Sequence, residues 1–445
     1  MEESVEHVVR SCFAGFRVVL VTNIWEAMTF KVVELHFFSF FPYHFSVLSA
    51  VRRTTVLAWG YIALLTLVTV IAFISATPFP LDDHFFFQQF IETLAAGKLD
   101  LSIPGFHGMN ILAVPWYLIS RSPIAQIEFQ MFSGMLLPLC AFLAGWRLFK
   151  SLWYGVVLAT IIALMPFHSF SSLRGWMVAT YNCLVFLTIY GAAKGARWTW
   201  FTWGFSIISL PFSVALLPLL LYLTPSAPGK AWWWRYRQIW YGLLIPVVYV
   251  LLQYVQVGHI NVGVHQEFNE ANVWSGPGRM FLNAAHTLQI IFSVHNFYFV
   301  DPALTGQGDM MHTTPVLVFL GLYALFQPKH FFTERGLPLA LLLGSVMGIG
   351  LNVALDHMDD FYMQTGIYFM MLAALPVLKK QPLWIPIVLV TLHFQWMYFY
   401  LQHGAVFQLG PLFFLVPATV DVVFAIWCVV HRENIWQWCR ATYGK

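Results

Sequence analysis

The feature that most constrains this chain is a series of apolar stretches, many of them near 20 residues long, with short polar segments between them. A helix needs about 20 apolar residues to cross the roughly 30 Å hydrocarbon core of a bilayer. Only 10% of the 445 residues are charged and 59% are hydrophobic, whereas soluble proteins carry roughly 25% charged residues. The composition argues against a soluble enzyme, a secreted disulfide scaffold and a disordered regulator. It predicts an all-α polytopic membrane protein.

The apolar stretches predict about twelve transmembrane helices. They are expected at residues 55–77, 123–147, 154–168, 176–193, 198–209, 210–224, 238–256, 313–327, 337–354, 362–378, 382–402 and 411–430. The stretch 198–224 is ambiguous, because Pro211 near its middle allows either one long helix or two short helices that turn back.

Basic residues favour the hairpin. With a turn at Pro211, nearly all of the 23 Lys and Arg residues fall on the side of Arg52 and Arg53. The basic residues left on the other side are Lys98, Arg121, Arg174 and Arg279. Lys and Arg in short loops are retained in the cytoplasm, so this asymmetry predicts that both chain ends are cytoplasmic.

This topology divides the chain into three parts. Residues 1–54 form a cytoplasmic or interfacial segment, although Met28 is an alternative start; residues 55–430 form the membrane domain, and residues 431–445 form a cytoplasmic tail. Two external loops are long, 78–122 and 257–312. In the first loop, apolar residues recur at helical spacing from Phe86 to Leu94, which predicts a helix in the membrane interface with its apolar side in lipid. A second short helix is expected at 109–119.

An acidic pair stands at the outer end of the first predicted span, in the sequence Asp82-Asp83-His84. Two adjacent carboxylates suit a general base or a divalent-cation site, and His84 could add a ligand. They could equally cap the interfacial helix, since Asp is favourable at a helix N-terminus. The residues therefore make a divalent cation a candidate cofactor without requiring one.

Other candidate site residues lie on the same side. Arg174 fits either a phosphate or lipid headgroups, and Arg279, near Glu267 and Glu270, fits an acceptor or a phosphate. His357, Asp359 and Asp360 belong to a second polar cluster that suits a metal or acceptor contact, or simply a solvated acidic loop.

The first external loop resembles that of the GT-C integral-membrane glycosyltransferases. The resemblance lies in the acidic pair after the first span, the interfacial helix, the Gly-Lys-Leu-Asp-Leu-Ser-Ile-Pro-Gly stretch at 97–105, and the later short hairpin. It covers residues 55–225 and is nearest to bacterial enzymes similar to protein mannosyltransferases and to those that glycosylate lipid A or core sugars.

The resemblance implies inverting transfer of a sugar from a polyprenyl-phosphate donor to a lipid, glycan or protein acceptor, at the periplasmic face of a bacterial inner membrane. Asp82 or Asp83 would be the general base that deprotonates the acceptor hydroxyl; Asp82 is favoured as the first acid of the motif, with Asp83 and His84 supporting the acceptor or a metal. Two departures from the family pattern stand out: the loop 169–177 has no acid, with Tyr181-Asn182 further along instead, and no Arg or Lys occurs at 356–360.

Two alternatives belong to other classes, a transporter or flippase and a polysaccharide polymerase or ligase. Transporters favour internal repeats and polar groups at the midplane, whereas polymerases and ligases favour Arg and His in a large late loop. Neither pattern fits well, although Asp421 and His393 lie within predicted spans. For Asp421 we expect an interhelical hydrogen bond rather than a proton relay. Membrane lipids are expected partners, and nucleic acid is not.

Overall fold

The computed structural model describes residues 50–78, 84–103, 105–175, 178–224, 236–258, 277–292, 314–354, 363–405 and 407–430. Within these ranges the chain is helical and contains no strand. The first half comprises α2 (Ala50–Ser75), α3 (His84–Ala95), α4 (Gly108–Ser120), α5 (Ala125–Phe149), α6 (Leu152–Leu164), α7 (Pro166–Leu173), α8 (Val178–Lys194), α9 (Thr199–Ser209), the 3₁₀ helix η2 (Pro211–Leu216) and α10 (Leu217–Leu223). The second half comprises α12 (Arg237–Val257), α14 (Pro277–Phe292), α15 (Pro315–Phe326), α16 (Pro328–Phe331), α17 (Gly336–Ala354), α18 (Gln364–Lys380), α19 (Trp384–His403), η6 (Pro411–Phe414) and α20 (Leu415–Val430).

All twelve predicted spans are helical, but the predicted number of membrane crossings is not confirmed. Six helices are long and apolar enough to cross a membrane, or seven if the bent pair α6 and α7 counts as one span. The difference is one of length: α8 and α18 have 17 residues each, about 26 Å at 1.5 Å per residue. The hydrocarbon core is roughly 30 Å thick.

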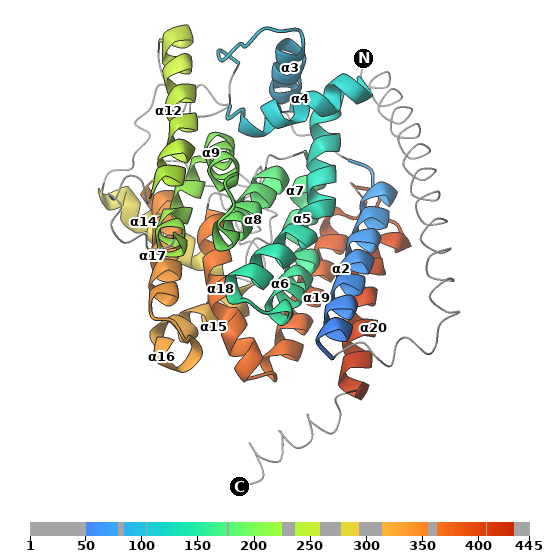
Figure 1. Cartoon of the computed structure of the whole chain (residues 1–445). Helices are drawn as coiled ribbons and strands as arrows, with labels where there is room; N and C mark the ends of the chain where they lie inside the picture. The colour runs from blue at the N-terminus through green and yellow to red at the C-terminus, as the bar shows by residue number, and fades with distance from the viewer. Residues whose placement is uncertain are drawn as a thin grey trace.

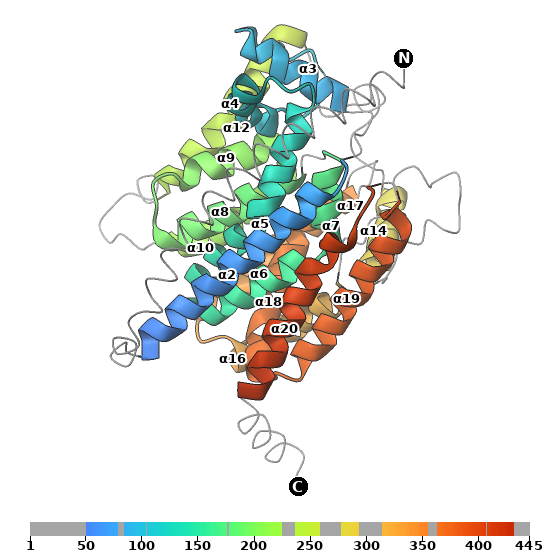
Figure 2. The same cartoon turned by 90° about the vertical axis from the view of Figure 1, so that its right-hand side faces the viewer.

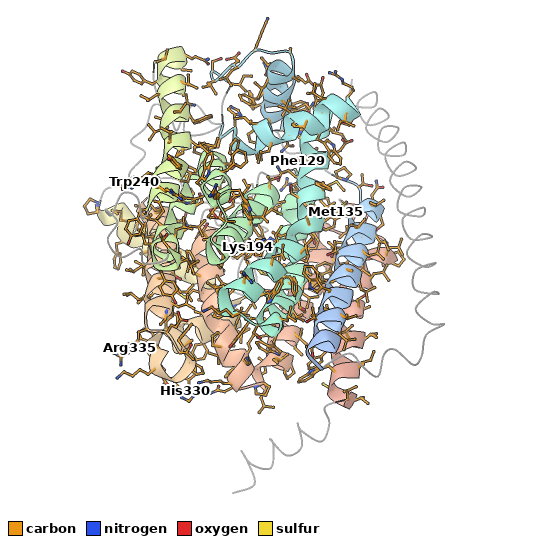
Figure 3. The ribbon with its side chains drawn as sticks, in the orientation of Figure 1. Phe129, Met135, Lys194, Trp240, His330 and Arg335 are labelled. Atoms are coloured by element: carbon orange, nitrogen blue, oxygen red, sulfur yellow. The ribbon has the colours of Figure 1, made fainter. Side chains whose placement is uncertain are left out.

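The helices form a bundle with a cap of two short helices at one end. α3 and α4 lie across the end of α5 in both views (Figures 1 and 2). Phe129 lies near this capped end, whereas His330 and Arg335 lie at the opposite end (Figure 3). α5 packs against α6 and α8, and α18 packs against α15 and α17.

Small residues let α18 pass through the middle of the bundle. Every residue from Gln364 to Leu378 is buried. A Cβ placed on Gly321 of α15 would lie 2.3 Å from the carbonyl oxygen of Met370, and one on Gly348 of α17 would lie 2.6 Å from the nitrogen of Gly366. Such close backbone approaches are typical of helices that pack within a membrane.

The hairpin predicted at Pro211 is confirmed. α9 ends at Leu210, and the indole Nε1 of Trp203 donates to the carbonyl oxygen of Ser213 at 3.1 Å. Residues ten apart in a straight helix would be about 15 Å apart, so the chain turns back on itself here.

Some of the basic residues lie at the end of the bundle away from the cap, where Arg335 is labelled (Figure 3). Lys150 Nζ lies 3.7 Å from a carboxylate oxygen of Glu334, and the Tyr222 hydroxyl at the end of α10 donates to the same carboxylate. Lys379 Nζ lies 4.8 Å from the ring centre of Tyr154. α10 therefore returns to the end at which α5 finishes.

The predicted orientation of α3 is wrong. Phe87, Phe90 and Ile91, expected in lipid, are buried in the protein, with Phe87 only 2% exposed. Phe90 belongs to a small core with Leu101, Ile103, Ile208 and Tyr249, which joins the cap to α9 and α12. The exposed aromatic residues on this helix are Phe85, at 68%, and Phe86, at 38%.

Asp421 lies beside a histidine of the neighbouring helix. Nε2 of His393 in α19 lies 3.1 Å from Oδ1 of Asp421 in α20. The His393 Nδ1–H donates to the carbonyl oxygen of Leu389 at 2.7 Å. The pair thus links two neighbouring helices.

Candidate active site

The candidate site begins at the residue that follows the acidic pair. His84 is the first residue of α3 and is buried. Its Nδ1–H donates to Oε1 of Gln126 at 3.0 Å, and Nε2 of Gln126 donates to the carbonyl oxygen of Gly175. Gln126 therefore links the chain directly after Asp83 to the chain directly after Arg174.

A second glutamine continues this network along α3. Oε1 of Gln88 accepts from the backbone N–H of Gln126 at 3.2 Å. Its Nε2 donates to the carboxylate of Glu92 at 2.9 Å and to the carbonyl oxygen of Ser122 at 3.2 Å. Buried polar groups are costly unless they are hydrogen-bonded. The side chain of Gln88 bonds the backbone of Gln126, and this bond holds α3 against the start of α5.

The first turns of α5 supply further buried polar side chains. The indole Nε1 of Trp116, in α4, donates to the Glu128 carboxylate at 2.9 Å. Gln130 accepts from the backbone N–H of Thr180 at 3.1 Å and donates to the sulfur of Met109 at 3.0 Å. α5 is thus the element that ties the cap to α8.

Glycine is required at 175. Its φ is +72°, and a Cβ there would lie 2.7 Å from Cγ1 of Ile127 and 2.9 Å from Oε1 of Gln126. Only glycine adopts this conformation readily, and only glycine leaves room for Gln126. The half-buried Arg174 is thereby held next to the network.

A deeper polar group lies where α7, α8 and α18 meet. Nδ2 of Asn182 and Nδ1 of His168 are 3.3 Å apart. The hydroxyl of Tyr181 is hydrogen-bonded to that of Thr365, in the first turn of α18. The second candidate cluster, which lies outside the described residues, precedes α18 in the chain. α8 therefore contacts the described residues that follow this cluster.

The predicted site residues fall into two groups. Asp82, Asp83, His357, Asp359 and Asp360 lie outside the described residues, as does the side chain of Arg279 in α14. His84 and Arg174 are described: His84 bonds Gln126 directly, and Gln126 bonds the carbonyl oxygen of Gly175, the residue after Arg174. α14 itself is anchored by Asn283, whose Nδ2 donates to the carbonyl oxygen of Val353 at 3.2 Å, near the end of α17.

Burial determines the protonation of the histidines at this end. It lowers the pKa of His84, against the smaller opposing effects of its hydrogen bonds to Gln126 and Pro123 and of the Glu92 charge. Burial also lowers the pKa of His107, before α4, to about 4. Both imidazoles are therefore neutral near pH 7. Among the described residues no three His, Cys, Asp or Glu side chains group as a metal site.

Sequence analysis missed the uncharged members of the network. Gln126, Gln130 and Ser133 lie at positions i, i+4 and i+7 of α5, which places them on one helical face. That spacing of polar residues inside an otherwise apolar span is the signal that could have identified them.

Two solved structures align with most of this chain. ArnT from Cupriavidus metallidurans, bound to undecaprenyl phosphate, aligns with a TM-score of 0.46 and 16% identity over 77% of this chain and 63% of its own. The Archaeoglobus fulgidus oligosaccharyltransferase in its apo form aligns with a TM-score of 0.42 and 13% identity over 82% of this chain and 56% of its own. This chain spans less than two thirds of either structure. No protein-family model and no curated protein sequence matches it.

Proposed function

We propose that this protein is a membrane glycosyltransferase that moves a sugar from a polyprenyl-phosphate donor to a lipid, glycan or protein acceptor, with Asp82 as the general base. The observation that carries the proposal is the His84–Gln126–Gly175 connection. It links the chain beside an acidic pair to the chain beside an arginine, and an acceptor base and a donor-phosphate ligand must lie close together for glycosyl transfer.

The leaving group and the acceptor of this reaction need different amounts of catalytic assistance. The leaving group is a lipid phosphate, which departs with little acid assistance. The acceptor hydroxyl needs a positioned base. The Asp82 carboxylate takes the hydroxyl proton, the acceptor oxygen bonds to the anomeric carbon, and the bond from that carbon to the phosphate oxygen breaks with inversion.

Asp83 and His84 support this base. Consecutive Cα atoms are about 3.8 Å apart, so an anchored His84 limits where Asp83 and Asp82 can lie. His84 is neutral at pH 7 because burial lowers its pKa, so it does not stabilise the carboxylate as a cation would. Its contribution is to position the acidic pair, where misplacement by about 1 Å can cost 100-fold in rate.

Arg174 is proposed to bind the donor phosphate, since a guanidinium matches phosphate geometry and remains charged. Arg279, His357, Asp359 and Asp360 are proposed acceptor or donor contacts. A divalent cation at Asp82, Asp83 and His84 is a further proposal: it would fit the ligand chemistry of the carboxylates. We place the site at the periplasmic face of a bacterial inner membrane.

The test is sugar transfer in vitro. Purified wild type, Asp82→Asn and Asp83→Asn would receive a panel of radiolabelled polyprenyl-phosphate sugars, with membrane extract as the acceptor source, with and without EDTA. Asp100→Asn is the matched control, because Asp100 is in the same loop and its carboxylate caps the exposed backbone of Ser102 at 3.0 Å.

We expect transfer by wild type and Asp100→Asn and none by Asp82→Asn. Transfer by well-folded Asp82→Asn would refute the base assignment. If the folded wild type transfers no sugar from any donor, the transporter or flippase alternative gains support, and substrate flux into liposomes would be measured next. Extension of a glycan into a polymer would indicate the polymerase alternative.

A further inference from the structure

A cavity of about 250 Å³ opens between the starts of α9 and α12, lined by Arg197, Trp200, Arg237 and Tyr241. Both arginines are exposed, and each stands at the beginning of a helix: Arg197 two residues before α9, and Arg237 as the first residue of α12. The rings of Trp200 and Tyr241 meet edge to face, with centres 6.2 Å apart. Two guanidinium groups thus share one hollow with two amphipathic aromatic rings.

The chain surrounding this cavity is cationic. No Asp or Glu occurs between Glu128 and Glu267, a stretch that includes all of α8, α9, α10 and α12. No acid from those helices can therefore neutralise the two arginines. Two positive charges in one hollow repel each other, and their arrangement is favourable when an anion lies between them.

The cavity lies at the end of α12 opposite to the one that contacts the first long loop. At the other end of α12, the side-chain amide of Gln256 bonds the backbone of Leu99 and Leu101 in the first external loop. α12 has 21 residues, so its two ends are about 30 Å apart. The cavity is therefore about 30 Å from the part of the first long loop that the other end of α12 contacts.

An apolar track leads away from the cavity along α12. Tyr241, Leu244, Val248, Leu251 and Val255 are all exposed. They follow one another at spacings of three or four residues, so they lie along one face of the helix. Trp240, labelled on this helix, also projects from the bundle (Figure 3). Aromatic residues of this kind concentrate where a membrane meets water.

We propose that this cavity binds the phosphodiester headgroup of an anionic phospholipid, whose acyl chain lies on the α12 track. Basic pockets between helices of membrane proteins suit such headgroups. Trp200 and Tyr241 would lie at headgroup depth, with the acyl chain beside Leu244 and Val248. A free phosphate shares the chemistry of the headgroup, but it has no acyl chain that could contact the track.

The experiment is native mass spectrometry of the full chain, released from detergent containing either dioleoyl phosphatidylglycerol or dioleoyl phosphatidylcholine. Variants would be Arg197→Gln, Arg237→Gln and the double substitution. Arg335→Gln is the matched control, since it removes an exposed arginine at the end away from the cap. We expect retention of phosphatidylglycerol to weaken about fivefold for each cavity arginine and about 30-fold for both.

Phosphatidylcholine binding and the Arg335→Gln variant should be unaffected. Equal retention of phosphatidylglycerol by wild type and the double variant would overturn the proposal. Competition would also overturn the proposal if inorganic phosphate displaced bound phosphatidylglycerol as effectively as added phospholipid does. That outcome would identify a site for free anions. A Leu244→Lys variant that keeps the cavity but lowers lipid retention would support the track specifically.

Discussion

Gly175 offers the sharpest test of the network at the candidate site, because the chain contains a matched control. Gly175 and Gly195 have nearly the same backbone conformation, with φ of +72° and +71°. A Cβ at Gly175 would meet Ile127 and Gln126 within 3.0 Å, whereas a Cβ at Gly195 would meet nothing within 4 Å. The two alanine substitutions therefore share backbone strain and differ in packing.

The expected magnitudes follow from that difference. A left-handed conformation costs an L-residue roughly 1–2 kcal/mol, so Gly195→Ala should lower the free energy of unfolding by about that much. Gly175→Ala carries the same strain plus overpacking worth roughly 1–3 kcal/mol. It also pushes Oε1 of Gln126 away from His84, because that oxygen is one of the atoms a new Cβ would meet.

The assay is reversible unfolding of both variants in mixed micelles, followed by tryptophan fluorescence, together with sugar transfer by the folded fraction. Gly175→Ala should be less stable than Gly195→Ala and should lose at least tenfold in transfer rate, while Gly195→Ala keeps its rate. Equal losses of stability would show that Ile127 and Gln126 move aside freely. Unchanged transfer by folded Gly175→Ala would show that the network does not position the acidic pair.

Three other outcomes are expected. Burial lowers the pKa of His107 to about 4 from the usual 6.5, so the unfolded chain takes up a proton first as the pH falls. The free energy of unfolding should therefore drop by roughly 1 kcal/mol between pH 7.5 and 5.5. A His107→Gln variant that unfolds with the same pH dependence would contradict this. Arg174→Ala should raise the KM for the lipid donor, while Arg121→Ala, which removes an exposed arginine after α4, should not. Equal KM values for the two variants would indicate that Arg174 contacts lipid headgroups instead. A reporter fused after Lys230 should be cytoplasmic, and an external signal would overturn the orientation assigned to the later helices.

Helix positions were predictable because long apolar runs leave few alternatives. The hairpin at Pro211 also followed from the sequence, since a proline and the charge asymmetry agreed. Which face of α3 is buried in the protein could not be predicted from the sequence. Phe85, Phe86 and Phe87 are equally apolar, and periodicity cannot tell lipid from protein as the surroundings of an apolar face. Only the positions of α4, α9 and α12 determine that Phe87 is buried and Phe85 exposed.

Some residues of the candidate site could likewise be predicted from the sequence, and others could not. Charged residues in external loops are conspicuous because charge is rare in this chain, so Asp82, Asp83, His84 and Arg174 could be selected from sequence. The spacing of Gln126 with Gln130 and Ser133 could mark it as a buried polar residue, but its partners could not be predicted, because they lie 42 and 49 residues away in the chain. An uncharged amide within a span has many possible roles until its partners are known.

The distribution of positive charge gives Arg174 its importance at the capped end. Four basic residues are predicted outside, and a donor phosphate needs at least one of them. Lys98 is exposed at the end of α3, and Arg121 is exposed with its Cζ 5.6 Å from the ring centre of Tyr117. Arg279 belongs to α14, beyond the described contacts of the cap. Arg174 alone among the four directly precedes a residue bound by Gln126. If a phosphate is held beside the acidic pair, Arg174 is the cation that the chain positions for it.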